Sequence, residues 1–153
     1  MERIASFCVD HTKLMPGMYL SRQDGPEGEI LTWDIRMKRP NHGSYLSPAA
    51  AHTLEHLFAT YARNSKYSKG VVYVGPMGCL TGFYLVTTGL TPTEALALTQ
   101  EAFAWMADYE GDIPGASAVE CGNYLMMDPI AARVEAAAMV PVLQALDAEH
   151  LHY

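Results

Sequence analysis

The stretch 47-SPAAAHTLEHLFATYAR-63 predicts a helix with a defined start. Ser47 is suited to accept a hydrogen bond from a free backbone amide, and the proline after it has no N–H to lose at the first helical position. His52 and His56 are four residues apart, so their side chains project from one face of this helix, with Glu55 beside them. Imidazole is a common ligand of transition metals, so this face can supply two metal ligands. The same pattern also fits an amphipathic helix with two solvated histidines.

The composition predicts one globular domain over residues 1–153, because half of the residues are hydrophobic and only 18% are charged. The net charge of −7 argues against nucleic acid or an anionic membrane as the main partner and favours a small ligand. No apolar run approaches the roughly 20 residues of a membrane span, and the first residues lack the apolar core of a signal peptide. Cys8, Cys79 and Cys121 are too few and too far apart for a disulfide framework, so we expect a reduced, cytoplasmic protein.

Several strands are predicted around the first helix. Residues 30–38 alternate between apolar and polar side chains, which predicts a half-buried strand whose polar face could line a pocket. Arg36 lies on that polar face and could hold a substrate group, although an arginine at such a position is more often simply solvated. Shorter apolar runs at residues 15–20, 70–75 and 83–88 predict further strands.

The connection 75-GPMGCLTG-82 is dense in glycine, which permits a ligand to approach the backbone closely. Cys79 in this loop is therefore a candidate accessible thiol, although a hairpin loop with an incidental cysteine fits the sequence as well. The loop has neither a G-x-G-x-x-G pattern nor a G-K-[ST] ending, so it does not predict a phosphate site.

Two more helices are predicted in the second half of the chain. The segment 91-TPTE-94 has the form of a capping box and begins a helix that runs to about Glu110. Residues 118–124 indicate a short strand that gives way to irregular chain. Asp128 caps a third, alanine-rich helix, which must end or kink at Pro141.

The tail with His150 and His152 is expected to be a short, fraying helix, a poor place for a catalytic site. Strands separated by long helices predict an α+β fold in which helices pack on one face of an antiparallel sheet.

A catalytic metal site needs three protein ligands and one open position. His52 and His56 supply two ligands, and Cys121 is a strong candidate for the third, because a metal stabilises a deprotonated sulfur. Cys79 would then be a free thiol near the cation, and Glu55 a second acid–base group. A cation, a thiol and a carboxylate together suit the movement of protons at carbons beside a carbonyl.

These motifs, in this order, resemble those of the S-ribosylhomocysteine lyases, the LuxS family, from residue 6 to about residue 122. The matching segments are Ser6-Phe7 with Asp10-His11, Asp34-Ile35-Arg36 with Pro40-Asn41, 52-HTLEH-56, 76-PMGC-79 with 81-TGFY-84, and Cys121-Gly122. The resemblance implies a lyase that converts S-ribosylhomocysteine to homocysteine and 4,5-dihydroxy-2,3-pentanedione, the autoinducer-2 precursor, by carbonyl migration and β-elimination of the thioether. It becomes weak after residue 128.

The resemblance also implies roles for single residues. One divalent metal per subunit, natively Fe(II) and often replaced by Zn(II), would be held by His52, His56 and Cys121. Cys79 and Glu55 would be the acid–base residues.

The same resemblance implies that Ser6, His11 and Arg36 contact the sugar and that Arg63 lies near the homocysteine end. It implies a homodimer with both sites at the interface, so that Ser6 and His11 would reach the site from the partner chain.

The chain departs from the family pattern just before the Pro-Met-Gly-Cys motif. Tyr73 and Gly75 stand where some members of the family carry an acidic residue and a serine. The resemblance therefore does not say which residues contact the amino-acid end of the substrate.

Two other interpretations are compatible with the metal motif. H-x-x-E-H is also the inverted zinc-peptidase motif, in which the glutamate activates water and a downstream glutamate is the third ligand. A metal-sensing or storage domain would need His52, His56 and Cys121 alone, and would leave Cys79 and Arg36 without a role.

Overall fold

The computed structural model describes residues 2, 4 and 7–153. The elements, in chain order, are β1 (Gly17–Asp24), β2 (Ile30–Arg36), α1 (Pro48–Asn64), the 3-10 turn η2 (Ser68–Gly70), β3 (Val71–Pro76), β4 (Gly82–Thr88), α2 (Pro92–Asp108), α3 (Pro129–Gln144) and the 3-10 turn η3 (Ala148–His150). The predicted Ser6 contact lies outside the described residues.

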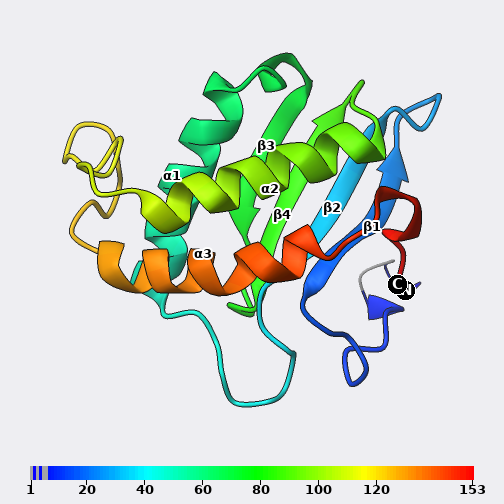
Figure 1. Ribbon diagram of the computed structural model, residues 1–153, viewed down its shortest axis with the longest axis horizontal. Helices are drawn as coiled ribbons and strands as arrows, with labels where there is room; N and C mark the ends of the chain where they lie inside the picture. The colour runs from blue at the N-terminus through cyan, green and yellow to red at the C-terminus, as the bar shows by residue number, and fades with distance from the viewer. Residues whose placement is uncertain (1, 3, 5–6) are drawn as a thin grey trace.

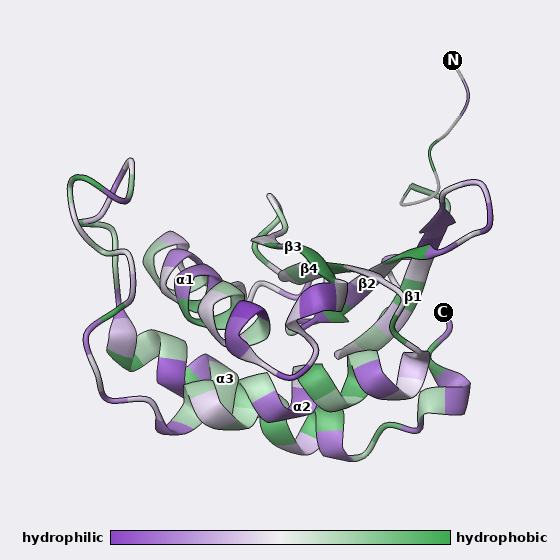
Figure 2. Cartoon of the chain, turned by 90° about the horizontal axis from the view of Figure 1, so that it is seen from above, coloured by the Kyte–Doolittle hydropathy of each residue, from purple (hydrophilic) through white to green (hydrophobic). Residues whose placement is uncertain are grey.

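The four strands form an antiparallel sheet in the order β1-β2-β4-β3 (Figure 1). The central strands β2 and β4 pair in unbroken register from Ile30↔Thr88 to Arg36↔Gly82. Helices α2 and α3 cover one face of the sheet, and α1 lies beside β3 (Figure 2). The predicted α+β fold, with an antiparallel sheet and helices on one face, is confirmed.

Apolar side chains from the helices and the sheet form one core that holds α1 in place. Phe58 of α1 contacts Phe83 of β4 and Phe103 of α2 edge-on, with ring centroids 6.3 and 5.5 Å apart. All three rings are fully buried. The opposite, partly exposed face of α1 carries the two histidines, so this packing fixes where the histidines point.

The predicted helix starts are confirmed. Ser47 Oγ accepts from the N–H of Ala50 at 3.1 Å, and Thr91 and Glu94 form a reciprocal capping box. The sequence predicted that the third helix ends or kinks at Pro141. The helix does not end there, because α3 continues to Gln144. A proline so close to the C-terminus removes only one helical hydrogen bond, and the buried Leu143 holds the last turn on the core.

The strand predicted at residues 118–124 is also wrong. The segment forms turns in the loop between α2 and α3, away from the sheet (Figure 1). Val119 is 97% exposed there. A short apolar run becomes a strand only when a neighbouring strand supplies hydrogen bonds, and none lies beside this loop among the described residues.

Candidate active site

Three metal-ligand side chains converge between α1 and the loop that joins α2 to α3. The ligand atoms of His52, His56 and Cys121 all lie within 4.8 Å of one another. The two Nε2 atoms are 3.2 Å apart, and Cys121 Sγ is 3.4 Å from Nε2 of His52. All three side chains are half-buried. This group could hold one metal ion.

The hydrogen bonds behind the histidines decide which ring nitrogens are available. His52 Nδ1 lies 3.0 Å from the carbonyl oxygen of Met126, and His56 Nδ1 lies 2.7 Å from that of Pro114. A carbonyl only accepts, so in the neutral imidazole each Nδ1 carries the proton and each Nε2 presents a lone pair. Two lone pairs 3.2 Å apart repel each other unless a cation lies between them, so the donor set fits a divalent metal.

The loop that carries Cys121 is itself shaped for this contact. Gly115 has φ +73°, and a Cβ there would lie 3.2 Å from His56 Nδ1. Glycine therefore permits both the turn and the approach of the Pro114 carbonyl to the ring. The backbone N–H of Asn123 donates to Cys121 Sγ at 3.4 Å, which helps to fix the position of the sulfur. The Pro114-Gly115 pair is a turn signal in the sequence, but the sequence does not show that the turn faces His56.

The loop between β3 and β4 lines two hollows, and the first of them also includes His52 of this cluster. A hollow of about 220 Å³ is lined by His52 and Glu55 of α1 and by Gly78 of the loop. A second hollow, of about 240 Å³, is lined by Cys79 together with His11 and Arg36. Cys79 is exposed, as predicted. The loop thus contributes to both hollows, one of which contains a carboxylate and the other a thiol.

A sequence model of the S-ribosylhomocysteinase (LuxS) family matches residues 4–149 of this chain. The chain belongs to the LuxS family.

Curated relatives agree with the family match over most of their length. The chain is 51% identical over 139 residues to the S-ribosylhomocysteine lyase of Desulfotalea psychrophila, covering 89% of this chain and 87% of the relative. It is 46% identical over 157 residues to the S-ribosylhomocysteine lyase of Phocaeicola vulgatus, covering 100% and 98%. The lyase of Finegoldia magna is 43% identical over 155 residues, covering 100% of this chain and 99% of the relative.

None of the helices in the described part of the chain combines the length and the apolar character that a membrane span needs.

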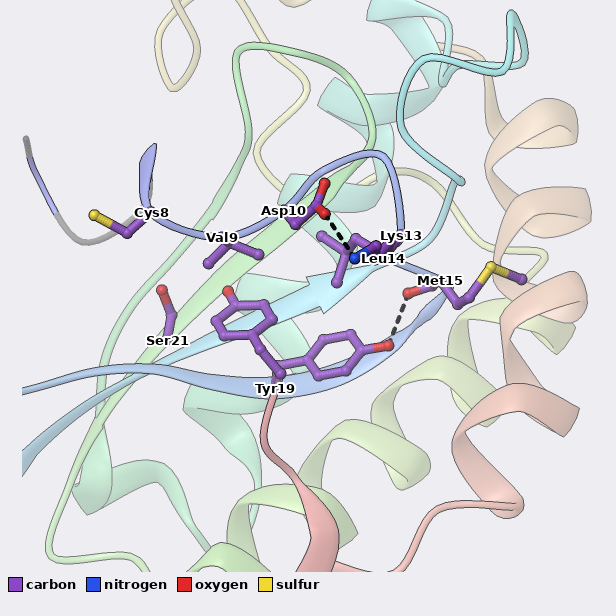
Figure 3. A pocket seen from close by; sticks show the side chains of 9 residues that line it. Cys8, Val9, Asp10, Lys13, Leu14, Met15, Tyr19 and Ser21 are labelled. Atoms are coloured by element: carbon purple, nitrogen blue, oxygen red, sulfur yellow. Dashed lines mark hydrogen bonds and ion pairs between the residues drawn. The ribbon is translucent and has the colours of Figure 1, made fainter.

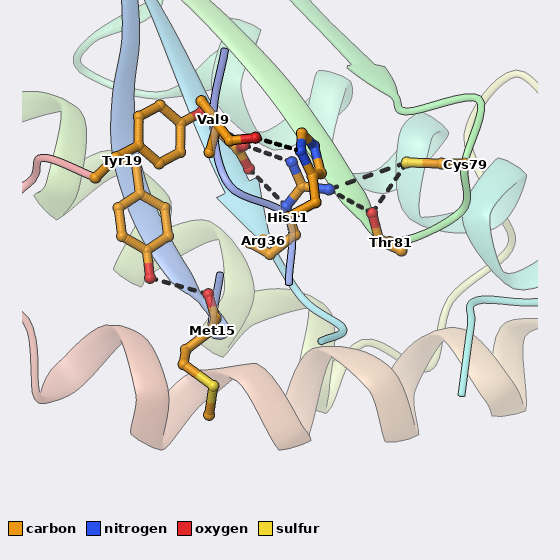
Figure 4. Close-up of polar contacts among 9 residues, drawn as sticks. Val9, His11, Met15, Tyr19, Arg36, Cys79 and Thr81 are labelled. Carbon is orange, nitrogen blue, oxygen red and sulfur yellow. Dashed lines mark hydrogen bonds and ion pairs between the residues drawn. The ribbon is translucent and has the colours of Figure 1, made fainter. Parts of the chain in front are cut away.

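Arg36 of this LuxS chain is not a solvated strand residue, and the prediction of a half-exposed polar face on β2 is wrong at this point. Arg36 and Asp34 are 2% and 1% exposed and form an ion pair with Nη2 and Oδ2 2.5 Å apart. Nη1 donates to Thr81 Oγ1 and lies 3.9 Å from Cys79 Sγ (Figure 4). Burial opposes the charge of Arg36, but the hydrogen bond and charge of Asp34 outweigh it, so the pKa of Arg36 lies above its usual value.

His11 lies in the Cys79 hollow of its own chain, with Nδ1 2.9 Å from the carbonyl oxygen of Val9 (Figure 4). His11 and Cys79 thus line one hollow of the same chain, and the expected contribution of His11 from a partner chain stays a prediction. Arg63 lies elsewhere: it is exposed, donates to the carbonyl of Val72 at 2.9 Å, and follows His56 by about two helical turns, roughly 10 Å.

Tyr73 and Gly75, the two residues that depart from the family pattern, lie against each other in the structure. The hydroxyl of Tyr73 occupies the space above Gly75, where a Cβ would lie only 2.1 Å from it. Any side chain at residue 75 would displace this ring. His150 and His152 are exposed in the tail and are not part of the metal cluster.

Proposed function

We propose that this chain cleaves S-ribosylhomocysteine to homocysteine and 4,5-dihydroxy-2,3-pentanedione, with a metal on His52, His56 and Cys121. The observation that carries the proposal is the three-ligand cluster of a LuxS chain beside hollows that contain Glu55 and Cys79. A cysteine as the third ligand argues against the inverted zinc-peptidase interpretation, which needs a glutamate there.

The reaction is a series of proton movements along the sugar. Each carbonyl shift removes a proton from the carbon beside the carbonyl and returns one to the former carbonyl carbon. The elimination then removes a proton from C4 and breaks the C5–S bond, and the electron pair leaves on sulfur, which takes up a proton to become the homocysteine thiol. The enol that remains transfers its hydroxyl proton away and gains a proton at C5, which gives the diketone. A divalent cation, when bound, supplies a Lewis acid for the sugar oxygens.

The protein moves these protons with Cys79 and Glu55, each of which lines one of the two hollows at the β3–β4 loop. Arg36 and Thr81 hold the sulfur of Cys79 in place, since Thr81 Oγ1 is 3.0 Å from Sγ. His11 and Arg36 line the same hollow and present polar groups to the sugar hydroxyls. Ser6 and Arg63 complete the substrate contacts in this proposal, with Arg63 toward the homocysteine end.

The family resemblance favours Fe(II) as the metal in the cell, replaceable by Zn(II), and two imidazoles and a thiolate suit both ions. The chain is a homodimer with its sites at the interface. The sheet face opposite the helices supports this, since Tyr73, Tyr84 and Val86 line an open hollow there. The protein works in the cytoplasm, where reducing conditions keep Cys79 and Cys121 as free thiols.

The test supplies S-ribosylhomocysteine to anaerobically purified, iron-loaded protein and follows the release of free thiol. We expect turnover in the wild type and almost none in Cys79→Ala or Glu55→Ala, with metal content retained in Cys79→Ala. Absence of thiol release from intact, metallated wild type would refute the proposal. Loss of metal from Cys79→Ala would refute the assignment of Cys79 as a residue that does not bind the metal.

A further inference from the structure

The tail after η3 is docked on β1. Leu151 is 2% exposed, and its carbonyl accepts from the N–H of Leu20 at 2.7 Å. Tyr153 stacks on Tyr19, with ring centroids 5.0 Å apart and planes inclined by 12°. The C-terminal end of the chain accordingly lies beside β1 (Figure 1). These contacts hold the Tyr153 ring in one place.

The hydroxyl of Tyr153 contacts a buried carboxylate. This hydroxyl donates to Oδ2 of Asp34 at 2.8 Å, across 119 residues of sequence. The other side-chain donors to Asp34 among the described residues are Nε and Nη2 of Arg36, at 3.1 and 2.5 Å. Burial and the charge of Asp34 hold the pKa of Tyr153 above its ordinary value, so the phenol keeps its proton and remains a donor.

Asp34 in turn orients Arg36, which lies beside the thiol of Cys79. Arg36 uses one edge of its guanidinium on Asp34 and directs Nη1 to Thr81 and Cys79 (Figure 4). A guanidinium is planar and rigid, so fixing one edge fixes the direction of the remaining nitrogen. A connected path therefore runs from Tyr153 through Asp34 and Arg36 to Cys79, although Tyr153 itself does not touch the thiol.

We propose that Tyr153 is a positioning residue for Cys79, acting through Asp34 and Arg36. The inference rests on the proposed function, in which Cys79 moves protons. Loss of the hydroxyl would leave one position of a buried carboxylate without its donor, and the ion pair would turn to recover it. Proton transfer depends on distances of a few tenths of an ångström, so a small rotation of Arg36 lowers the rate.

The test compares Tyr153→Phe with Tyr19→Phe. Both variants remove one phenolic hydroxyl from the same ring pair, but the Tyr19 hydroxyl donates to the carbonyl of Met15 and makes no hydrogen bond to Asp34 (Figure 3). Each variant is assayed for kcat and KM at equal metal content. The rate of Cys79 alkylation by iodoacetamide is measured without substrate, resolved by peptide mass spectrometry. Cys8, which lines the same hollow as Tyr153, is the internal reference.

We expect Tyr153→Phe to lower kcat about tenfold and to slow Cys79 alkylation several-fold, roughly the effect of a small misplacement of a reacting group. Tyr19→Phe stays within about twofold of the wild type in both measurements, and Cys8 reacts at the same rate throughout. Equal kcat and Cys79 reactivity in the two variants would overturn the inference. Faster Cys8 alkylation in Tyr153→Phe would overturn it too, since the tyrosine would then only hold the tail in place. A wild type that releases no thiol would refute the proposed function, and the alkylation comparison would still decide the role of Tyr153.

Discussion

Gly82 is the position where one added methyl group tests the packing of the site most severely. A Cβ at Gly82 would lie 2.1 Å from the carbonyl oxygen of Ile35 and 3.1 Å from Cα of Arg36. An ordinary contact begins at 3.4 Å, so the substitution Gly82→Ala demands a displacement of about 1.3 Å, the difference between 3.4 and 2.1 Å. The atom in the way belongs to the backbone of β2, so no side-chain rotation can relieve the clash.

The expected loss of stability follows from where the clash lies. Overpacking that shifts backbone costs about 1–3 kcal/mol and occasionally more, and a displacement between two paired central strands belongs at the upper end, about 3 kcal/mol. That is a large fraction of the roughly 5–15 kcal/mol that stabilises a domain. The displaced segment includes Arg36 and Thr81, so turnover should fall as well.

Two neighbouring glycines are matched controls. A Cβ at Gly78 meets nothing within 4 Å, and the three atoms nearest to one at Gly75 belong to Tyr73, an exposed ring that can rotate away. Gly78→Ala should stay within about 0.5 kcal/mol of the wild type or gain slightly, because alanine restricts the unfolded chain. Gly75→Ala should cost less than about 1 kcal/mol.

The assay is urea unfolding of the reduced, metal-free proteins at one protein concentration, followed by circular dichroism. Metal removal and a fixed concentration matter, because metal binding and dimerisation both add to apparent stability. The reasoning is refuted if Gly82→Ala lies within about 1 kcal/mol of Gly78→Ala, since the strands would then yield to the methyl group at little cost.

Three further predictions test the loop, the capping box and the third helix. Gly115→Ala should weaken zinc binding about tenfold in a competition titration by displacing the Pro114 carbonyl from His56, while Gly122→Ala, where a Cβ meets nothing within 4 Å, should not. Equal affinities would contradict the role given to that carbonyl. Glu94 accepts from the N–H of Thr91, and this hydrogen bond lowers its pKa below the usual 4.5, so its stabilisation is present above that pH and lost as the pH falls. The stability difference between wild type and Glu94→Ala should therefore shrink from pH 7 to pH 3 in urea titrations; a constant difference would argue against it. Pro141→Ala should raise stability by about 1 kcal/mol in thermal unfolding, because the exposed Pro141 removes one hydrogen bond from the last turns of α3, and a loss would show that the ring packs usefully.

Several features of the chain followed directly from local sequence. The start of α1 at Ser47, the capping box at Thr91 and the common face of His52 and His56 depend on residues within one helical turn of each other. Hydrogen bonds and side-chain directions at that range are set by backbone geometry alone. The same reasoning located Cys79 in an exposed loop and the strands β2 and β4 to within a residue or two of their bounds.

Features that depend on distant neighbours could not be read in this way. The segment 118–124 carries strand-forming residues but has no strand to pair with, and α3 passes Pro141 because the core holds its last turn. The orientation of the metal cluster depends on two loop carbonyls, 58 and 74 residues from the histidines that they hold.

The sequence by itself determined the starts of the three long helices and the strands β2 and β4, because each is encoded within a few neighbouring positions. Only the tertiary structure decided that Arg36 is buried rather than solvated. Its charge is tolerated because Asp34, Thr81 and Tyr153, brought together from three parts of the chain, satisfy the ion pair away from water. Alternation along a strand shows which residues share a face, but whether that face meets solvent depends on what the rest of the chain places over it.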